Sequence, residues 1–229
     1  MDRIIGVLGG MGPEATADAF LKLIANTPAK KDQEHIPVII ASLPAIPDRT
    51  ENILYGGPSP LPAMIKSLKV LENSGASCIV MPCNTAHYWL EELRKNTASE
   101  FISIIESACD RIIAEGISSV ALVATTATVK TKLYQRRLEK AGISCIIPDV
   151  VHQEEIMKSI IAFKRGEHRL SSEIIASSIK SLQDKGCEKI IMGCTEIPLI
   201  LESHIREKPQ DFIDATDELI KRAVQWYYR

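Results

Sequence analysis

Short apolar runs alternate with longer segments of helical period along the whole chain. The apolar runs contain little polar alternation, which is typical of strands buried on both faces of a parallel sheet. Strands are predicted at Ile4–Leu8, Val38–Ser42, Cys78–Met81, Phe101–Ile105, Val120–Ala124, Ser144–Ile147, Lys189–Met192 and Phe212–Ile213.

The segments between these strands predict helices. They cover Glu14–Ala25, Pro60–Ser74, Thr85–Lys95, Glu106–Glu115, Thr131–Ala141, His152–Gly166, Ser171–Lys185 and Asp217–Trp226. Gly75, Gly116, Gly142 and Gly186 follow or end four of the segments, where a left-handed helix cap favours glycine. Regular alternation of strand and helix predicts an α/β fold with parallel sheets.

One stretch, from Pro44 to Pro62, breaks the alternation. It holds five prolines and the pair Gly56-Gly57, and it is too long for a plain connection. We expect a functional or lid-like loop there.

An internal repeat divides the chain into two halves. Met81-Pro82-Cys83-Asn84-Thr85 and Met192-Gly193-Cys194-Thr195-Glu196 lie 111 positions apart, and the match continues without a gap on both sides. The repeat predicts two pseudosymmetric α/β domains. Each cysteine follows a predicted strand, where open α/β sheets place ligands.

Composition excludes several classes of protein. The chain has 229 residues, of which 45% are hydrophobic, and a formal net charge of −2, so it has no basic footprint for nucleic acid. It contains neither an apolar run long enough to span a bilayer nor the pattern of a secretory signal. Its six cysteines lack disulfide-scaffold spacing, which predicts reduced thiols and a cytoplasmic protein.

Cys83 and Cys194 are the main candidates for chemistry. Both precede predicted helix starts, where backbone N–H groups and the helix dipole lower the pKa of a thiol and attract a carboxylate. The other four cysteines read as small buried hydrophobes: Cys78, Cys109, Cys145 and Cys187.

Two further motifs leave alternatives open. His87 lies four residues after Cys83, so it either tunes that thiol, shares a metal with it, or simply forms a hydrogen bond on a helix face. No closed set of zinc ligands accompanies it. The glycine segment Gly6–Glu14 does not fit the dinucleotide spacing, and it better suits a tight turn that lets backbone approach a small ligand.

Arg49 and Lys164 are candidate partners for an acidic substrate. Arg49 lies in the irregular loop, and Lys164 lies near the end of a predicted helix. From the residues alone, each is better interpreted as a solvated surface charge.

The order of the motifs resembles one family. Leu8-Gly9-Gly10-Met11-Gly12-Pro13, Pro47-Asp48-Arg49-Thr50, Pro82–His87, Leu122–Thr128 and Gly193–Glu196 together resemble the cofactor-independent aspartate/glutamate racemases, and aspartate racemases most. The resemblance implies an active site in the cleft between two domains, one of residues 1–99 with 208–229 and one of residues 100–207. It also implies a homodimer that uses no pyridoxal phosphate, metal or nucleotide.

The resemblance assigns roles to individual residues. Cys83 and Cys194 would be the two acid/base thiols on opposite faces of the substrate's Cα. Arg49 and Lys164 would lie near its side-chain carboxylate, which reverses the surface interpretation. The full set expected to bind substrate is Met11, Arg49, Asn84, Thr85, Thr125, Thr126, Thr128, Lys164 and Thr195.

Two departures bear on the substrate. Glutamate racemases carry Asp-Ser-Gly in the first loop and a histidine after the second Cys-Thr. Here the first loop is Gly9–Gly12, and Glu196 follows Thr195. The sequence thus predicts an isomerase that interconverts L- and D-aspartate. Broader specificity that includes glutamate, a related maleate isomerase or malonate decarboxylase, a binding protein, and a redox or metal module remain as alternatives.

Overall fold

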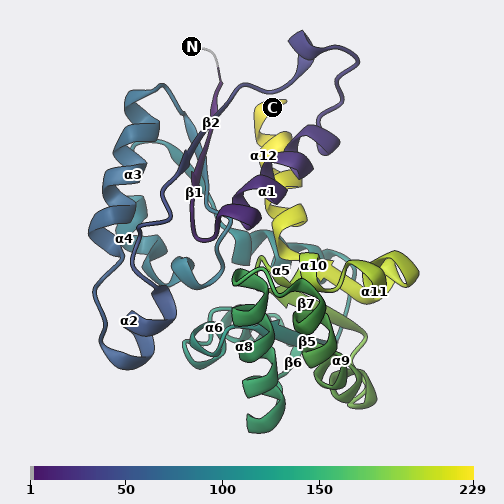
Figure 1. Cartoon of the computed structure of the whole chain (residues 1–229). Helices are drawn as coiled ribbons and strands as arrows, with labels where there is room; N and C mark the ends of the chain where they lie inside the picture. The colour runs from purple at the N-terminus through teal and green to yellow at the C-terminus, as the bar shows by residue number, and fades with distance from the viewer. Residues whose placement is uncertain (1–2) are drawn as a thin grey trace. The chain divides into compact units, whose positions relative to one another are not determined.

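The computed structural model describes residues 3–229 and divides into two compact units. The first unit contains the chain up to Ser107 together with Thr216–Arg229, and the second contains Ala108–Ala215. Each unit has its own four-stranded parallel sheet with helices packed on it (Figure 1).

The sheet of the first unit has the order β2-β1-β3-β4. Its strands are β1 (Ile5–Gly9), β2 (Val38–Ser42), β3 (Cys78–Val80) and β4 (Glu100–Ile102). Every pairing is parallel. β1 and β3 are buried along their whole length, because central strands of such a sheet are covered on both faces.

Helices complete the first unit. They are α1 (Pro13–Asn26), α2 (Arg49–Tyr55), α3 (Leu61–Asn73), α4 (Leu90–Lys95) and α12 (Ala215–Tyr227), with 3₁₀ turns η1 (Asp32–Glu34) and η2 (Thr85–Trp89).

The C-terminal helix α12 returns to the N-terminal strand and helix. It lies beside α1 in the upper part of Figure 1, where the Asn26 side-chain amide donates to the Asp217 carboxylate at 3.0 Å. The Arg3 guanidinium donates to the last carbonyls of the helix, those of Trp226 (2.7 Å) and Tyr227 (2.9 Å). A cation at that end satisfies carbonyls that have no partner within the helix.

The second unit repeats this plan. Its sheet has the order β6-β5-β7-β8, again all parallel. The strands are β5 (Ser119–Ala124), β6 (Ser144–Ile146), β7 (Lys189–Gly193) and β8 (Phe212–Asp214). β3 and β7 therefore occupy the same place in their sheets, which confirms the pseudosymmetry predicted from the repeat.

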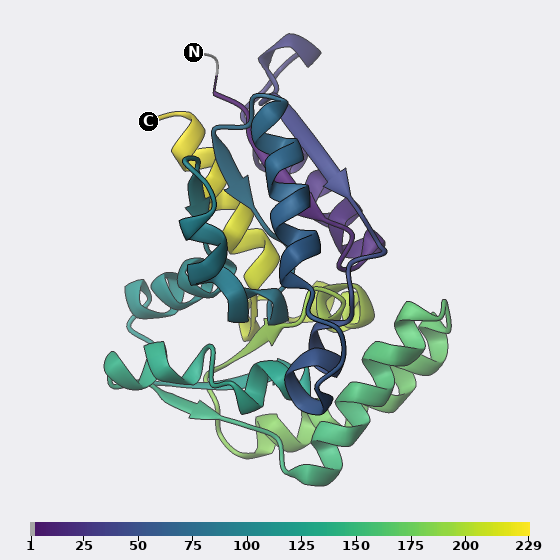
Figure 2. The same cartoon turned by 90° about the vertical axis from the view of Figure 1, so that its left-hand side faces the viewer.

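The helices of the second unit follow the same alternation. They are α6 (Thr126–Lys130), α7 (Gln135–Lys140), α8 (Val150–Lys164), α9 (His168–Asp184), α10 (Ile197–Ile200) and α11 (Glu202–Glu207), with η3 (Pro209–Asp211). The long helices α8 and α9 pack against each other as a hairpin (Figure 2). Together they bury an apolar core against β5 and β7.

The units join within helix α5 (Ile104–Ala114) and again at the start of α12. The boundaries predicted from the sequence, 99/100 and 207/208, differ from these. β4 hydrogen-bonds to β3 and stays in the first sheet, while β8 hydrogen-bonds to β7 and stays in the second. Each boundary therefore falls after its edge strand.

Three local predictions need correction. The irregular segment between Pro44 and Pro62 contains α2, because the Asp48 carboxylate caps it by accepting from the Glu51 amide at 2.9 Å and Gly56 ends it with a φ of 72°. The helix expected over residues 131–141 is shorter than predicted, because only α7 lies in that range, and α6 precedes it with Lys132 at a φ of 56° between the two helices. The helix expected over residues 85–95 begins as the 3₁₀ turn η2.

None of the helices within residues 3–229 combines the length and apolar character needed to cross a bilayer.

Candidate active site: two thiol-bearing loops

Cys83 lies in the loop after β3, in the first unit. The loop enters η2 directly, and the two polar residues that follow the thiol, Asn84 and Thr85, are only 2% and 5% exposed. Cys83 itself shares a buried cluster with Met11 and Ile46. Buried polar side chains in a loop at the end of a parallel strand are typical of a ligand site.

His87 holds this loop in place. Its Nδ1 lies 2.8 Å from the carbonyl oxygen of Cys83, and its Nε2 accepts the Ile104 amide at 3.1 Å. One nitrogen donates and the other accepts, so the ring is the neutral Nδ1–H tautomer. Burial lowers the pKa of His87 to about 4. Both nitrogens engage backbone, which leaves neither for a metal and makes the hydrogen-bonded alternative the correct one.

The glycine turn after β1 supplies a second wall of the same region. Gly10 has a φ of 87°, and a Cβ placed there would lie 2.4 Å from backbone atoms of Leu43. Its N–H donates to the Thr16 hydroxyl at 2.9 Å, and that hydroxyl donates to the Gly12 carbonyl at 2.8 Å. Only glycine allows this close approach of the turn to the end of β2. The turn positions Met11.

Arg49 is buried, at 8% exposed, which corrects the interpretation of it as a surface charge. Its guanidinium donates to three backbone carbonyls, those of Ile46 (3.2 Å), Pro47 (3.0 Å) and Met11 (3.4 Å). It forms no ion pair with any carboxylate among residues 3–229. A buried cation that is held by dipoles alone is prepared to accept an anion.

Cys194 occupies the equivalent loop of the second unit, after β7. Gly193 before it allows close packing, since a Cβ there would lie 2.7 Å from Leu122 and 3.3 Å from the Tyr134 ring. The thiol is 5% exposed, and its Sγ donates to Oε2 of Glu196 at 3.0 Å.

The expected lowering of the thiol pKa is wrong for Cys194. Burial raises the pKa of Cys194 well above its usual value, and the neighbouring Glu196 carboxylate raises it further. The helix that follows, α10, spans only Ile197–Ile200. So short a helix has too small a dipole to outweigh desolvation and a nearby negative charge.

Lys164, at the end of α8, reaches the same carboxylate. Its Nζ lies 3.5 Å from Oε1 of Glu196, while the Thr195 hydroxyl lies 3.2 Å from Oε2. The Lys164 side chain is 38% exposed and the Glu196 side chain 4%. Lys164 is thus an accessible cation with a buried partner, and no longer a plain surface charge.

The threonines after β5 form a capped turn. The Thr125 hydroxyl accepts the Thr128 amide at 3.2 Å, as the N-cap of α6, and lies 3.0 Å from the Thr128 hydroxyl. Thr126 is held from α8, because its amide donates to the Met157 sulfur at 3.2 Å and its hydroxyl accepts from the Gln153 amide at 3.3 Å.

The structure therefore collects the predicted residues into two groups, one in each unit. Met11, Arg49, Cys83, Asn84 and Thr85 surround the loop ends of β1, β2 and β3, while the second group gathers at the loop ends of β5 and β7. The members of the second group are Thr125, Thr126, Thr128, Lys164, Cys194 and Thr195. Their contact with substrate stays a prediction.

Sequence reasoning missed two contributors. Glu196 was read only as a helix-start residue and a departure from glutamate racemases, although it bonds to the thiol. Gln153 also donates to the Ala124 carbonyl at 3.0 Å, and so braces the end of β5. Helical spacing is the signal that could have found it, because Gln153, Met157 and Lys164 share one face of α8.

Of the other four cysteines, Cys78 and Cys109 are buried as predicted, whereas Cys145 and Cys187 are only partly buried. Burial raises the pKa of Cys78 and of Cys145 to about 12, and it also raises the pKa of Cys187. All six cysteines are free thiols.

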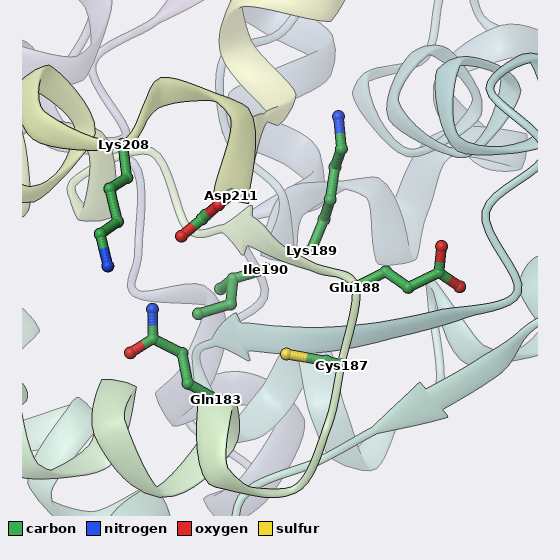
Figure 3. Close-up of a pocket in the computed structure, with 7 residues that line it drawn as sticks. All are labelled: Gln183, Cys187, Glu188, Lys189, Ile190, Lys208 and Asp211. Carbon is green, nitrogen blue, oxygen red and sulfur yellow. The ribbon is translucent and has the colours of Figure 1, made fainter.

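A separate hollow of about 330 Å³ lies at the N-terminal end of β7, the opposite end of this strand from Cys194 (Figure 3). Gln183, Lys208 and Asp211 line it with their polar ends. None of the predicted site residues lines this hollow. Residues 3–229 contain no group of three or more His, Cys, Asp or Glu side chains arranged to hold a metal ion.

Comparison with known proteins assigns the family. The sequence profile of the Asp/Glu/hydantoin racemase family matches residues 8–223, nearly the whole chain. The chain belongs to the Asp/Glu/hydantoin racemase family. Members of this racemase family are isomerases that act on small molecules, which confirms the resemblance found in the motifs.

Individual proteins are similar to this chain over most of their own length. The structure of Picrophilus torridus aspartate racemase superposes with a TM-score of 0.89 at 31% identity, covering 99% of this chain and 94% of that one. An uncharacterized protein of Pectobacterium carotovorum is 43% identical over 61% of this chain and 93% of its own. A broad-specificity amino-acid racemase of Bacillus subtilis is 26% identical over 98% of both chains.

Proposed function

We propose that this racemase interconverts L- and D-aspartate without a cofactor, with Cys83 and Cys194 as its two acid/base groups. The observation that carries the proposal is the equivalence of the two thiols. Each follows the strand in the third place of its sheet, β3 in one unit and β7 in the other. Two equivalent proton-transfer groups are what inversion at one carbon requires.

The chemistry follows from the weak acidity of a Cα–H bond. One cysteine, as thiolate, removes the proton from one face of Cα, and the other, as thiol, delivers a proton to the opposite face. In the structure the Cys194 thiol donates a hydrogen bond to Glu196 and has a raised pKa. We therefore expect Cys194 to be the proton donor in one direction of the reaction, with Cys83 as the base that removes the Cα proton in that same direction.

The negative charge that develops on the substrate spreads onto its α-carboxylate. The buried polar residues beside each thiol are suited to stabilise it, because preorganised donors in a site that excludes water act strongly on developing charge. Asn84 and Thr85 supply such groups beside Cys83, and Thr195 does so beside Cys194.

Arg49 supports an acidic substrate. Its guanidinium is buried against backbone carbonyls and has no carboxylate partner among residues 3–229. The side-chain carboxylate of aspartate would complete this arrangement, and a planar guanidinium binds a carboxylate in bidentate fashion. The aspartate racemase of Picrophilus torridus supports the same assignment.

The test combines chiral chromatography with Cα proton–deuterium exchange on both enantiomers of aspartate. We expect racemisation with solvent exchange in the native protein. Loss of a general acid or base typically costs 10²–10⁴-fold in rate, so Cys83→Ser and Cys194→Ser should each fall by about that factor. A single variant that retains full racemisation would contradict the two-thiol scheme.

Broad specificity for acidic amino acids is the second candidate. It is favoured by the similarity to the broad-specificity racemase of Bacillus subtilis over 98% of both chains. A panel of D- and L-amino acids separates the two, since a strict aspartate racemase leaves glutamate unchanged.

A further inference from the structure

Glu196 is placed to exchange a proton with Cys194. The two side chains are both buried, and their hydrogen bond joins Sγ to Oε2 over 3.0 Å. The Thr195 hydroxyl lies 3.2 Å from the same oxygen. A carboxylate within hydrogen-bond reach of a thiol has the geometry required of a proton acceptor.

Lys164 supplies the compensating charge. Its ammonium lies 3.5 Å from Oε1, the other oxygen of Glu196. A buried carboxylate without such a partner would be neutralised by protonation. The Glu196 carboxylate therefore lies between the thiol of Cys194 on one oxygen and the ammonium of Lys164 on the other.

We propose that Glu196 is the positioning residue that makes Cys194 a base, by taking the thiol proton onto its carboxylate. The S–H bond breaks, an O–H bond forms on Glu196, and the electron pair stays on sulfur as the thiolate. The return of the proton from Glu196 to sulfur restores the donor state. This inference rests on the proposed role of Cys194 in racemisation.

Conservation of charge is the physical reason for this route. Direct loss of the thiol proton to solvent would leave two negative groups, on Cys194 and Glu196, beside the single ammonium of Lys164. Transfer within the group leaves one negative and one positive charge, as before. Because buried charges are costly to add, the internal transfer is the cheaper way to form the thiolate.

The remaining groups around Cys194 do not compete for this proton. Tyr134 is fully buried near the thiol, and burial raises the pKa of its hydroxyl well above the usual value, so it stays neutral. Cys109 and Asp214 face Tyr134 and raise its pKa further. Glu196 and Lys164 are therefore the groups whose charge acts directly on Cys194.

The test measures the alkylation rate of Cys194 by iodoacetamide against pH, in the whole protein without substrate, with mass spectrometry to resolve the site. Transfer of the proton from Cys194 to Glu196 does not change the total number of protons that the two side chains bind. The native protein should thus show a pH-independent rate around neutrality and a rise only at high pH. In Glu196→Gln the plateau should vanish and the neutral rate should fall by about tenfold or more, because alkylation requires thiolate.

The opposite result overturns the inference. If Glu196 only repels negative charge, Glu196→Gln lowers the thiol pKa, Cys194 reacts faster at neutral pH, and the native protein shows no plateau. Glu196→Asp, which keeps a carboxylate, should restore part of the plateau. Glu202→Gln is the matched control, since Glu202 is exposed and pairs with Arg206 at the surface.

These readouts separate the two proposals. Alkylation is measured without substrate, so a missing plateau refutes the role of Glu196 whatever the protein racemises. If instead the plateau is present and Cys194→Ser still racemises aspartate at full rate, the proposed function fails and the proton exchange stands. Thermal unfolding of each variant verifies that it is folded.

Discussion

The neutral imidazole of His87 donates a hydrogen bond from Nδ1 to the carbonyl oxygen of Cys83, over 2.8 Å. Its other nitrogen accepts the amide of Ile104. The uncharged His87 side chain therefore connects the Cys83 loop to the start of α5 by two hydrogen bonds. Its effect on the thiol is through the position of the backbone.

Stability should depend on the protonation of His87. The folded-state pKa is about 4, below the ordinary value of 6.5, so the unfolded chain binds the proton more readily. The contribution of His87 is complete above pH 6.5 and is lost as pH falls towards 4. It amounts to about 3 kcal/mol at most.

The check is urea unfolding of the native protein and His87→Asn between pH 7 and 4. Asparagine keeps a donor for the Cys83 carbonyl and does not titrate. The difference in unfolding free energy between the two proteins should shrink as pH falls. A constant difference across this range would show that His87 has the same pKa in the folded and unfolded states.

Arg49 should control recognition of the side-chain carboxylate. Arg49→Lys keeps the charge but loses the planar fork, and Arg49→Met loses both. A hydrogen bond to a charged group contributes about 1.5–3 kcal/mol, so the kcat/KM of Arg49→Met for aspartate should fall by about 10–100-fold. Arg49→Lys should lie between Arg49→Met and the native enzyme.

The control for this prediction is the substrate. Replacement of Arg49 should leave kcat/KM unchanged for an amino acid without a side-chain carboxylate, such as alanine, whatever the rate of the native enzyme on it. An equal loss for aspartate and alanine would assign Arg49 to the fold alone, through its bonds to the Ile46, Pro47 and Met11 carbonyls.

Gly10→Ala should destabilise the first unit more than Gly56→Ala. Both glycines have positive φ, 87° and 72°, but only at Gly10 would a Cβ meet backbone, that of Leu43, at 2.4 Å. Gly56→Ala carries only the conformational cost of about 1–2 kcal/mol. Urea unfolding of both variants measures the cost of the contact with Leu43 as the difference between their losses in unfolding free energy. Equal losses would mean that the β1–α1 turn can move to accommodate the added Cβ.

Cys78 and Cys145 should resist alkylation in the folded protein. A pKa of about 12 leaves each about 10³-fold less thiolate at neutral pH than an ordinary thiol with a pKa near 9. Labelling with iodoacetamide at pH 8 should modify them only after unfolding. Rapid labelling of either in the native state would contradict its burial.

Much of the fold was predictable from local pattern. All eight predicted strands are present with ends shifted by a few residues, because a buried parallel strand requires a continuous apolar run. α2 was missed because its signals, Asp48 and Gly56, lie in a segment rich in proline. Helix capping there outweighed the composition of the segment.

The sequence by itself determined the alternation of strand and helix, the repeat, and the place of Cys83 and Cys194 after equivalent strands. These depend on hydrophobic period and on spacing along the chain. Only the tertiary structure decided that Arg49 is buried without a carboxylate partner among residues 3–229, and that Glu196 lies between Cys194 and Lys164. Burial and charge pairing set those properties, and both arise from packing between segments far apart in the sequence.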